Sequence, residues 1–132
     1  MYEIQTHKMN VVNNRLRVVA LDDPADGSIH RYSVTGFDTS ENRSAFNKNG
    51  TRKKQTALSI LFQNGPTAEH GVNGITVEVL FAIAIDWLEN QHAANPCSEY
   101  ALALEHGREA LEAVHDRSRE QIVQNAERKF KP

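Results

Sequence analysis

The stretch from Val77 to Leu88 constrains the fold of this chain more than any other, because nearly all of its residues are apolar. It follows an Asn73-Gly74 turn dipeptide, and Thr76 can cap a helix that has Glu78 in its first turn. A helix that is apolar on most sides is buried on most sides. A chain of 132 residues cannot wrap one helix completely. We therefore expect a sheet to cover one face of this helix and a second subunit to cover another.

A second helix is expected to begin near Asn95-Pro96 and to fold back on the first, because the connection between them is short. Its apolar residues recur at three- and four-residue steps, with a gap at Gly107; they are Tyr100, Leu104, Leu111 and Val114. Glycine costs about 1 kcal/mol relative to alanine inside a helix, so Gly107 indicates a close approach by a neighbouring backbone. After Val114 the apolar pattern weakens, and we expect the charged end of the chain to fray.

The part before this hairpin is predicted to be a small antiparallel sheet. Alternating residues predict strands near 2–6, 16–22 and 30–37, and the apolar residues of 55–62 predict a central strand covered on both faces. Turns are expected at 11–14 and 23–27. The sequence thus predicts an α+β fold: an N-terminal sheet part, 1–66, with a mobile basic loop at 38–54, and a helical hairpin at 67–132, in one oligomerising domain.

Charge and composition argue against several classes of partner. The net charge of -2 gives no general attraction to DNA, RNA or a membrane surface, so an anionic ligand would need a local cluster of positive charge. The longest apolar run, Val79 to Ile85, is too short to span a bilayer, which takes about 20 residues. We expect no signal peptide, and the single cysteine, Cys97, excludes an internal disulfide and indicates a reducing cytoplasm.

No catalytic or metal-binding pattern stands out in the sequence. The six histidines form neither an HxH nor an HExxH pair, and neither a P-loop nor a GxGxxG motif is present. His92, Cys97 and His106 straddle the bend of the hairpin but lack the spacing of metal ligands, so they are expected to be solvent or hairpin residues. We predict that the protein is not an enzyme and carries neither a metal nor a cofactor.

A phosphate-containing ligand fits the residues better. Arg31 lies beside Tyr32 on a predicted strand, and guanidinium groups both bind phosphate and stack on rings. The turn region 63–74 offers amides and backbone N–H groups beside a helix start, which can hold an anion. Each feature also has an ordinary interpretation, as solvated basic residues and as common turn chemistry.

Several motifs resemble a known family. They are FQNGP at 62–66, GVNGIT at 71–76, AIAID at 82–86, PCSEYALAL at 96–104, and VVALDDPADGSIHRYSVTGF at 18–37. Together they are similar to the bacteriophage Thoeris anti-defence sponge family, and the hairpin also resembles the phage anti-CBASS cyclic-nucleotide sponges. The resemblance covers most of the chain but not the segment 38–54.

This resemblance implies a binding protein that acts in the cytoplasm of the infected bacterial host. Such sponges bind immune messengers made by TIR-domain proteins, chiefly glycocyclic ADP-ribose, and hold them without degrading them, so that the effector is not activated. They assemble as homo-oligomers, from dimers to hexamers, and some also bind cyclic di- and trinucleotides on the hairpin. Carried over by motif, the messenger site comprises Arg31, Phe62, Gln63, Asn64, Asn73 and Thr76. Secondary ligand-binding candidates are Arg108, Arg117 and Arg119.

Three of these residues receive specific roles from the resemblance: Phe62 would stack on adenine, Arg31 would face the pyrophosphate, and Asn73 would bond ribose or a base edge. The chain also departs from the family, because relatives commonly carry arginines in IDRL and CRENALAL where this chain has IDWL at 85–88 and CSEY at 97–100. Two alternatives stay open: a structural helical-hairpin oligomerisation module without a small-molecule ligand, and a hydrolase of the same messengers.

Overall fold

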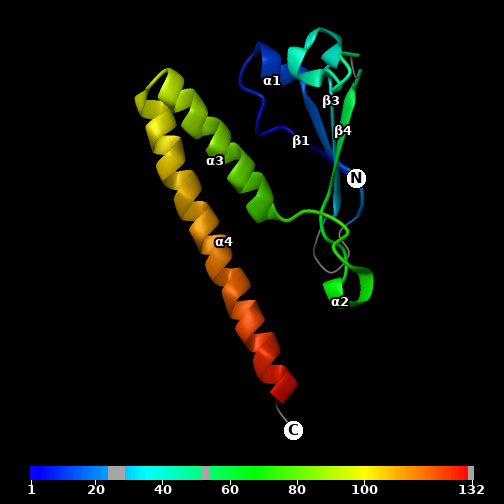
Figure 1. Ribbon diagram of the computed structural model, residues 1–132, viewed down its shortest axis with the longest axis vertical. Coiled ribbons are helices and arrows are strands. Elements are labelled where there is room, and N and C mark those ends of the chain that lie inside the picture. The colour runs from blue at the N-terminus through cyan, green and yellow to red at the C-terminus, as the bar shows by residue number, and fades with distance from the viewer. Residues whose placement is uncertain (24–28, 52–53, 131–132) are drawn as a thin grey trace. The chain divides into compact units, whose positions relative to one another are not determined.

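The computed structural model describes residues 1–23, 29–51 and 54–130 (Figure 1). The chain divides into two compact units, Met1–Ile75 and Thr76–Pro132. A four-stranded antiparallel sheet precedes two long helices, which confirms the predicted α+β class. The division falls after Ile75, whereas the sequence placed it after Pro66, because Ile75 still pairs with the end of the sheet through a bridge to Phe62.

The first unit is built on one antiparallel sheet whose spatial order follows the chain. Its strands are β1 (Tyr2–Ile4), β2 (Arg17–Ala20), β3 (Arg31–Thr35) and β4 (Ala57–Leu61), in the order β1-β2-β3-β4. Ala20 pairs with Tyr2 on one side and with Tyr32 on the other, and Tyr32 pairs in turn with Ile60. Cross-strand partners lie on the same face of a sheet, and Ala20 is completely buried in this row.

The prediction of a central strand at 55–62 was wrong in position, because β4 lies at the edge of the sheet. Its apolar residues Leu58 and Leu61 are 49% and 51% exposed. Apolar side chains on both faces of a strand predict that both faces are covered. They do not show whether the strand has one neighbouring strand or two. Each strand pairs antiparallel with the next one in the chain, which leaves the last strand at the edge.

The connections contain short helices that the sequence reading missed. Helix α1 (Val11–Arg15) replaces the turn predicted at 11–14, and the Asn10 side chain caps it by accepting from the Asn13 N–H at 2.8 Å. The segment predicted to be a mobile loop, 38–54, contains two 3₁₀ turns, η1 (Thr39–Glu41) and η2 (Arg43–Ala45). Another short helix, α2, covers Thr67–His70. The turn predicted at 23–27 lies largely outside the described residues.

Side-chain caps order the described part of segment 38–54. Asp38 accepts from the Ser40 N–H and Asn42 accepts from the Ser44 N–H, each at 2.9 Å, at the start of the two 3₁₀ turns. Asp and Asn favour such local bonds to backbone N–H groups over a continued helix. Asp38 and Asn42 contribute to the polar composition that predicted a loop, and they also cap the two 3₁₀ turns within it.

The second unit is the predicted helical hairpin, formed by α3 (Val77–Ala94) and α4 (Ser98–Phe130). The two helices are antiparallel. The Ser118 hydroxyl donates to Glu78 near the start of α3, and Arg108, which lies earlier on α4, pairs with Glu89 near the end of α3. Thr76 caps α3 as predicted, since its hydroxyl accepts from the Val79 N–H at 3.4 Å. Although the apolar pattern weakens after Val114, α4 continues through Ile122 and Val123 to Phe130, and 131–132, at the end predicted to fray, lie outside the described residues.

The start of α4 is organised by Cys97 rather than by Pro96. The Cys97 carbonyl accepts from the Ala101 N–H at 3.1 Å, and its sulfur accepts from the Tyr100 N–H at 3.4 Å. Nearby, the rings of Trp87 and Tyr100 meet edge to face with centroids 6.2 Å apart. Cys97 and this aromatic pair therefore define the closed end of the hairpin.

The apolar helix α3 is covered only in part. Ile85 of α3 and Leu104 of α4 are the two buried apolar residues among the described part of the hairpin. Val79, Ile83 and Trp87, which follow one another at four-residue steps on another face, are 42%, 62% and 54% exposed. We call these three residues the α3 stripe. None of the helices in the described part of the chain is long and apolar enough to cross a membrane.

Two glycines provide a matched test of this packing. A methyl group on Gly107 would lie 3.4 Å from Ile85 Cγ1, an ordinary contact, so the neighbour that Gly107 admits is a side chain and not the predicted backbone. A methyl group on Gly74 would lie 2.5 Å from the carbonyl carbon of Phe62, so the backbone would have to move. We expect Gly107→Ala to add up to about 1 kcal/mol of stability through helix propensity. We expect Gly74→Ala to remove roughly 1–3 kcal/mol.

Urea unfolding of both variants measures these two effects. Equal stability of the two variants would contradict the close approach of Gly74 to Phe62. A loss of stability in Gly107→Ala would mean that another backbone contacts α4 at this position.

Candidate functional site

Three strand ends meet at a pocket of about 380 Å³ in the first unit. β2 ends just before this pocket, β3 begins at it and β4 ends at it, because consecutive antiparallel strands bring these termini to one end of the sheet. The lining residues are Leu21, Asp22, His30, Arg31, Leu61, Phe62, Asn64 and Asn73. Small-molecule sites typically enclose about 300–1,000 Å³, so this pocket has room for a nucleotide-sized ligand.

Most of the predicted messenger-binding residues come together here. Arg31, Phe62, Asn64 and Asn73 all line the pocket. Gln63 is not among its lining residues, because its side chain is bonded to the backbone of its own segment. Thr76 is also outside the set, since its hydroxyl serves as the cap of α3. The predicted set therefore divides into pocket residues and residues that shape the adjoining backbone.

Phe62 is held by both its backbone and its ring. Its N–H donates to the His30 carbonyl at 2.8 Å, which extends the pairing of β3 and β4 beyond the strands themselves. Its ring meets that of Tyr32 edge to face, with centroids 5.8 Å apart and an angle of 81° between the planes. Such contacts favour one ring orientation. The half-buried Phe62 ring is thus a fixed apolar wall of the pocket.

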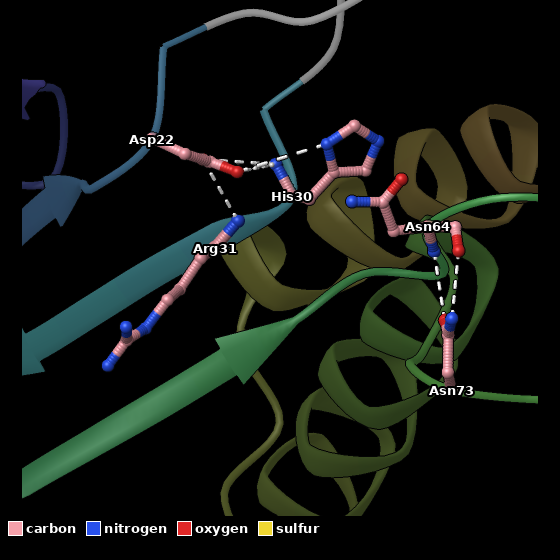
Figure 2. A network of polar contacts seen from close by, with 5 residues as sticks. All are labelled: Asp22, His30, Arg31, Asn64 and Asn73. Atoms are coloured by element: carbon pink, nitrogen blue, oxygen red, sulfur yellow. Dashed lines mark hydrogen bonds and ion pairs between the residues drawn. The ribbon is translucent and has the colours of Figure 1, made fainter.

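The segment 62–75 is closed by side chains that imitate backbone pairing. Asn73 accepts from the Asn64 N–H at 2.9 Å and donates to the Asn64 carbonyl at 2.8 Å (Figure 2). Gln63 accepts from the Asn73 N–H at 2.9 Å and donates to the carbonyls of Gly65 and Gly71 at 3.1 and 2.9 Å. We call this set of contacts the amide clamp.

The amide clamp gives Asn73 a positioning role that the resemblance did not assign. Both polar atoms of its side chain contact the backbone of Asn64, whereas the role expected for Asn73 was contact with ribose or base. The side-chain amide of Asn64, by contrast, bonds to no other residue in the described part of the chain, and it extends on the same side as the His30 ring (Figure 2). Asn64 is therefore the amide of the pocket with unused donors and acceptors.

Asp22 and His30 are pocket residues that the sequence reading missed. The Asp22 carboxylate accepts from the backbone N–H groups of His30 and Arg31, in each case at 3.2 Å. Burial opposes ionisation of Asp22, but the N–H donors of Arg31 and His30 outweigh it and hold the pKa of the carboxyl below its usual value. Asp22 was interpreted only as a turn former. An acid that ends one strand just before a turn, with the next strand beginning at His30-Arg31, was the available signal.

Arg31 lines the pocket, but its guanidinium group extends toward the opposite face of the sheet from the His30 ring. Its side chain is exposed, and in Figure 2 it points away from the His30 ring, although the two residues are adjacent in sequence. Alternation along a strand explains this, because neighbouring side chains point to opposite faces. The Arg31 guanidinium and the His30 ring therefore lie on opposite faces of β3, and Asn64 extends on the His30 side.

The secondary candidates lie on α4, in the second unit. Arg108 pairs with Glu89 at 2.9 Å, Arg119 pairs with Asp116 at 2.8 Å, and Arg117 lies 3.9 Å from Glu120. All three arginine side chains are more than half exposed, and exposed pairs of this kind are worth little to stability. Nearby carboxylates balance the charge of these arginines, so they form no concentrated cationic site.

The histidine and cysteine residues at the hairpin bend do not gather into a metal centre. His92 Nδ1 accepts from the Cys97 N–H at 3.3 Å, while His106 lies 3.5 Å from Glu109. Across the described residues, no three His, Cys, Asp or Glu side chains are grouped so as to hold a metal ion.

No protein-family model matches this chain, and no curated protein matches it either. The resemblance to the sponge family therefore rests on the motifs themselves.

Two matched substitutions test the amide clamp. Asn73→Asp replaces the donor that faces the Asn64 carbonyl with an acceptor, so it removes one hydrogen bond and sets two oxygens against each other. We expect a loss of roughly 1–3 kcal/mol of stability. Asn64→Asp makes the same chemical change at a side chain that bonds to none of the described residues, and we expect it to alter stability by less than about 0.5 kcal/mol. Thermal melts at neutral pH compare the two, and equal losses would contradict the clamp.

Proposed function

We propose that this protein is a phage anti-defence sponge that binds and sequesters glycocyclic ADP-ribose without degrading it, and so prevents activation of the Thoeris effector. One observation carries the proposal: Arg31, Phe62, Asn64 and Asn73, which the family motifs point to, line a single pocket of suitable volume. Sequestration of the messenger would take place in the cytoplasm of the infected bacterial host.

The pocket offers each part of such a ligand a chemically suitable partner. Arg31 can form charge-assisted hydrogen bonds with the pyrophosphate, and the fixed ring of Phe62 can stack on adenine. Stacking of a base on an aromatic ring contributes about 1–3 kcal/mol. Together with the amide of Asn64, these contacts can reach the nanomolar range, about -12 kcal/mol, that capture of a signalling molecule requires.

Holding the ligand intact is consistent with the side chains of the pocket. Hydrolysis needs a nucleophile or a general base placed against the scissile bond. Among the described residues, Asp22 is the only carboxylate that lines the pocket, and it accepts hydrogen bonds from backbone N–H groups. His30 could serve as a general base, but no serine, threonine or cysteine nucleophile is among the described lining residues. These features support a binding site more than a hydrolase.

Cyclic di- and trinucleotides are weaker candidates for this chain. Sponges that take them use the helical hairpin, where Arg108, Arg117 and Arg119 were the candidates. Each of these arginines already lies beside a carboxylate, and two hairpin arginines common in relatives are absent. We therefore assign the messenger to the pocket of the sheet.

The fate of the ligand separates the three alternatives. The protein is incubated with glycocyclic ADP-ribose, washed on a filter, heated to unfold it, and the released material is analysed by chromatography. A sponge returns the intact messenger, and a hydrolase returns altered products. A structural module retains none, and either of the last two outcomes would contradict the proposal.

Variants of the pocket sharpen the same experiment. Arg31→Ala is expected to weaken binding by roughly 2–4 kcal/mol through loss of a charge-assisted contact, with folding nearly unchanged. Arg17→Ala is the matched control, because Arg17 is an exposed strand arginine that pairs with Glu3 and does not line the pocket. Titration calorimetry measures both, and equal affinities would place the site elsewhere.

The α3 stripe supports a homo-oligomer, as the resemblance implies, from a dimer to a hexamer. Contiguous exposed apolar residues of this kind commonly mark a protein interface. A second copy of this chain is the occupant that we propose, because α3 is apolar well beyond the face that Ile85 and Leu104 bury. The same stripe favours the alternative of a purely structural module, which ligand binding distinguishes.

Light scattering tests the assembly. We expect the parent chain to be a dimer or larger at micromolar concentration. Ile83→Glu places a charge on a side chain that is 62% exposed, so it should dissociate the assembly without unfolding α3. Met9→Glu, at an exposed residue of the first unit, should leave the mass unchanged. A monodisperse parent monomer would rule out the oligomer.

A further inference from the structure

Asp22 and His30 are the two polar pocket residues to which the proposed function assigns no task. Their side chains are 39% and 19% exposed, so they are partly screened from water. They come from the end of β2 and the start of β3, and both line the pocket together with Phe62 and Asn64. Both residues lie within the motif at 18–37, but the resemblance assigned neither of them to the messenger site.

Hydrogen bonding beyond the strand ends places these residues in one row. The Leu21 N–H donates to the Arg31 carbonyl, and the Phe62 N–H donates to the His30 carbonyl, so pairing continues past Ala20, Arg31 and Leu61. In this continued register His30 lies beside Phe62, and Asp22 lies beside His30. Cross-strand neighbours share a face of the sheet, so Asp22, His30 and Phe62 face the same side.

The two polar side chains lie within ion-pair distance but form no hydrogen bond with each other. The distance from His30 Nδ1 to Asp22 Oδ2 is 3.8 Å, which is too long for a hydrogen bond. The Asp22 oxygens accept from backbone N–H groups, but a carboxylate has about four acceptor positions, so capacity remains. A ring nitrogen and a carboxylate oxygen therefore stand side by side, each able to form one more bond.

The chemistry of this pair favours a hydroxyl group over a phosphate. A hydroxyl donates one proton and also accepts, so a single O–H can donate to Asp22 while it accepts from the His30 N–H. A phosphate oxygen, which carries no proton, would be repelled by the ionised carboxylate. Arg31, which attracts phosphate, points away from His30 (Figure 2). The two ends of the pocket thus differ in the groups that they accept.

We propose that Asp22 and His30 form a hydroxyl-binding subsite that recognises a sugar hydroxyl of the ligand and orients it, with the sugar beside His30 and the phosphates beside Arg31. This inference rests on the proposed function and names the part of the ligand that these residues read. Backbone N–H groups hold Asp22, pairing with Phe62 holds His30, and the amide clamp and the Tyr32–Phe62 contact hold the adjoining wall, so the subsite is formed before the ligand arrives. The pocket would distinguish sugar nucleotides by their hydroxyl groups.

A ratio of affinities tests the subsite independently of overall affinity. Glycocyclic ADP-ribose and two analogues, each lacking one free ribose hydroxyl, are titrated into the parent protein and three variants. We expect the parent to bind one deoxy analogue roughly 10- to 100-fold more weakly than the messenger, because a polar site is left without its partner. His30→Phe keeps the ring shape, and Asp22→Asn keeps an acceptor for the backbone. Both should reduce this ratio several-fold.

Arg31→Ala is the control for the ratio, since it should weaken the messenger and both analogues alike and leave the ratio unchanged. A parent that binds the messenger but not more tightly than either analogue overturns the subsite and leaves the sponge proposal standing. If the ratio of messenger to analogue affinity is unchanged in both His30→Phe and Asp22→Asn, the subsite is likewise overturned and the sponge proposal stands. A parent that does not bind the messenger at all overturns both proposals.

Discussion

The structure depends above all on the closure of segment 62–75 against the end of β4. The Ile75 N–H donates to the Leu61 carbonyl at 2.8 Å, and the Gln63 N–H donates to the Ile75 carbonyl at 3.0 Å, so the chain returns to the strand that it has just left. Gly74 permits this return, because any side chain there would meet the backbone of Phe62. The same closure fixes one wall of the pocket and delivers the chain to Thr76, where the first helix of the hairpin begins.

The amide clamp explains how polar side chains can build a rigid wall. Asn73 and Gln63 use their amides as substitutes for backbone groups and satisfy donors and acceptors that a short loop would otherwise leave to water. The pocket is therefore shaped before a ligand binds, and less ordering free energy has to be supplied on binding. The sequestration that we propose would benefit from this, because it depends on affinity alone.

The sequence predicted the features that depend on local pattern. Alternation and helical periodicity identified the strands and the hairpin, and the Thr76 cap followed from hydroxyl chemistry at a helix start. Motif resemblance selected six residues for the messenger site. Arg31, Phe62, Asn64 and Asn73 line the pocket, whereas Gln63 and Thr76 do not. Strand order was not predictable in this way, so β4 was placed at the centre of the sheet when it lies at the edge. Asn10 was missed as a cap because an Asn also fits a turn.

The role of each residue in the site was harder to predict than which residues line the pocket. Asn73 carries an amide that suits a ligand, but only the folded segment shows that both its polar atoms contact Asn64. Asp22 lies in a turn-forming sequence, so its position at the strand end, bonded to the N–H groups of His30 and Arg31, was hidden until the strands were paired. Long-range strand pairing determines which polar side chains keep free hydrogen-bonding groups. A local sequence pattern does not predict that pairing.

Hydrogen exchange with and without glycocyclic ADP-ribose tests the central claim most directly, because it reports which backbone segments the ligand protects. If the pocket at the sheet end is the binding site, exchange should slow in peptides that carry Leu21–Asp22, His30–Arg31 and Phe62–Asn73. Peptides from α4 that carry Arg108, Arg117 and Arg119 should change little. Protection confined to α4, or no protection in any segment at saturating messenger, would contradict the assignment of this pocket as the messenger site.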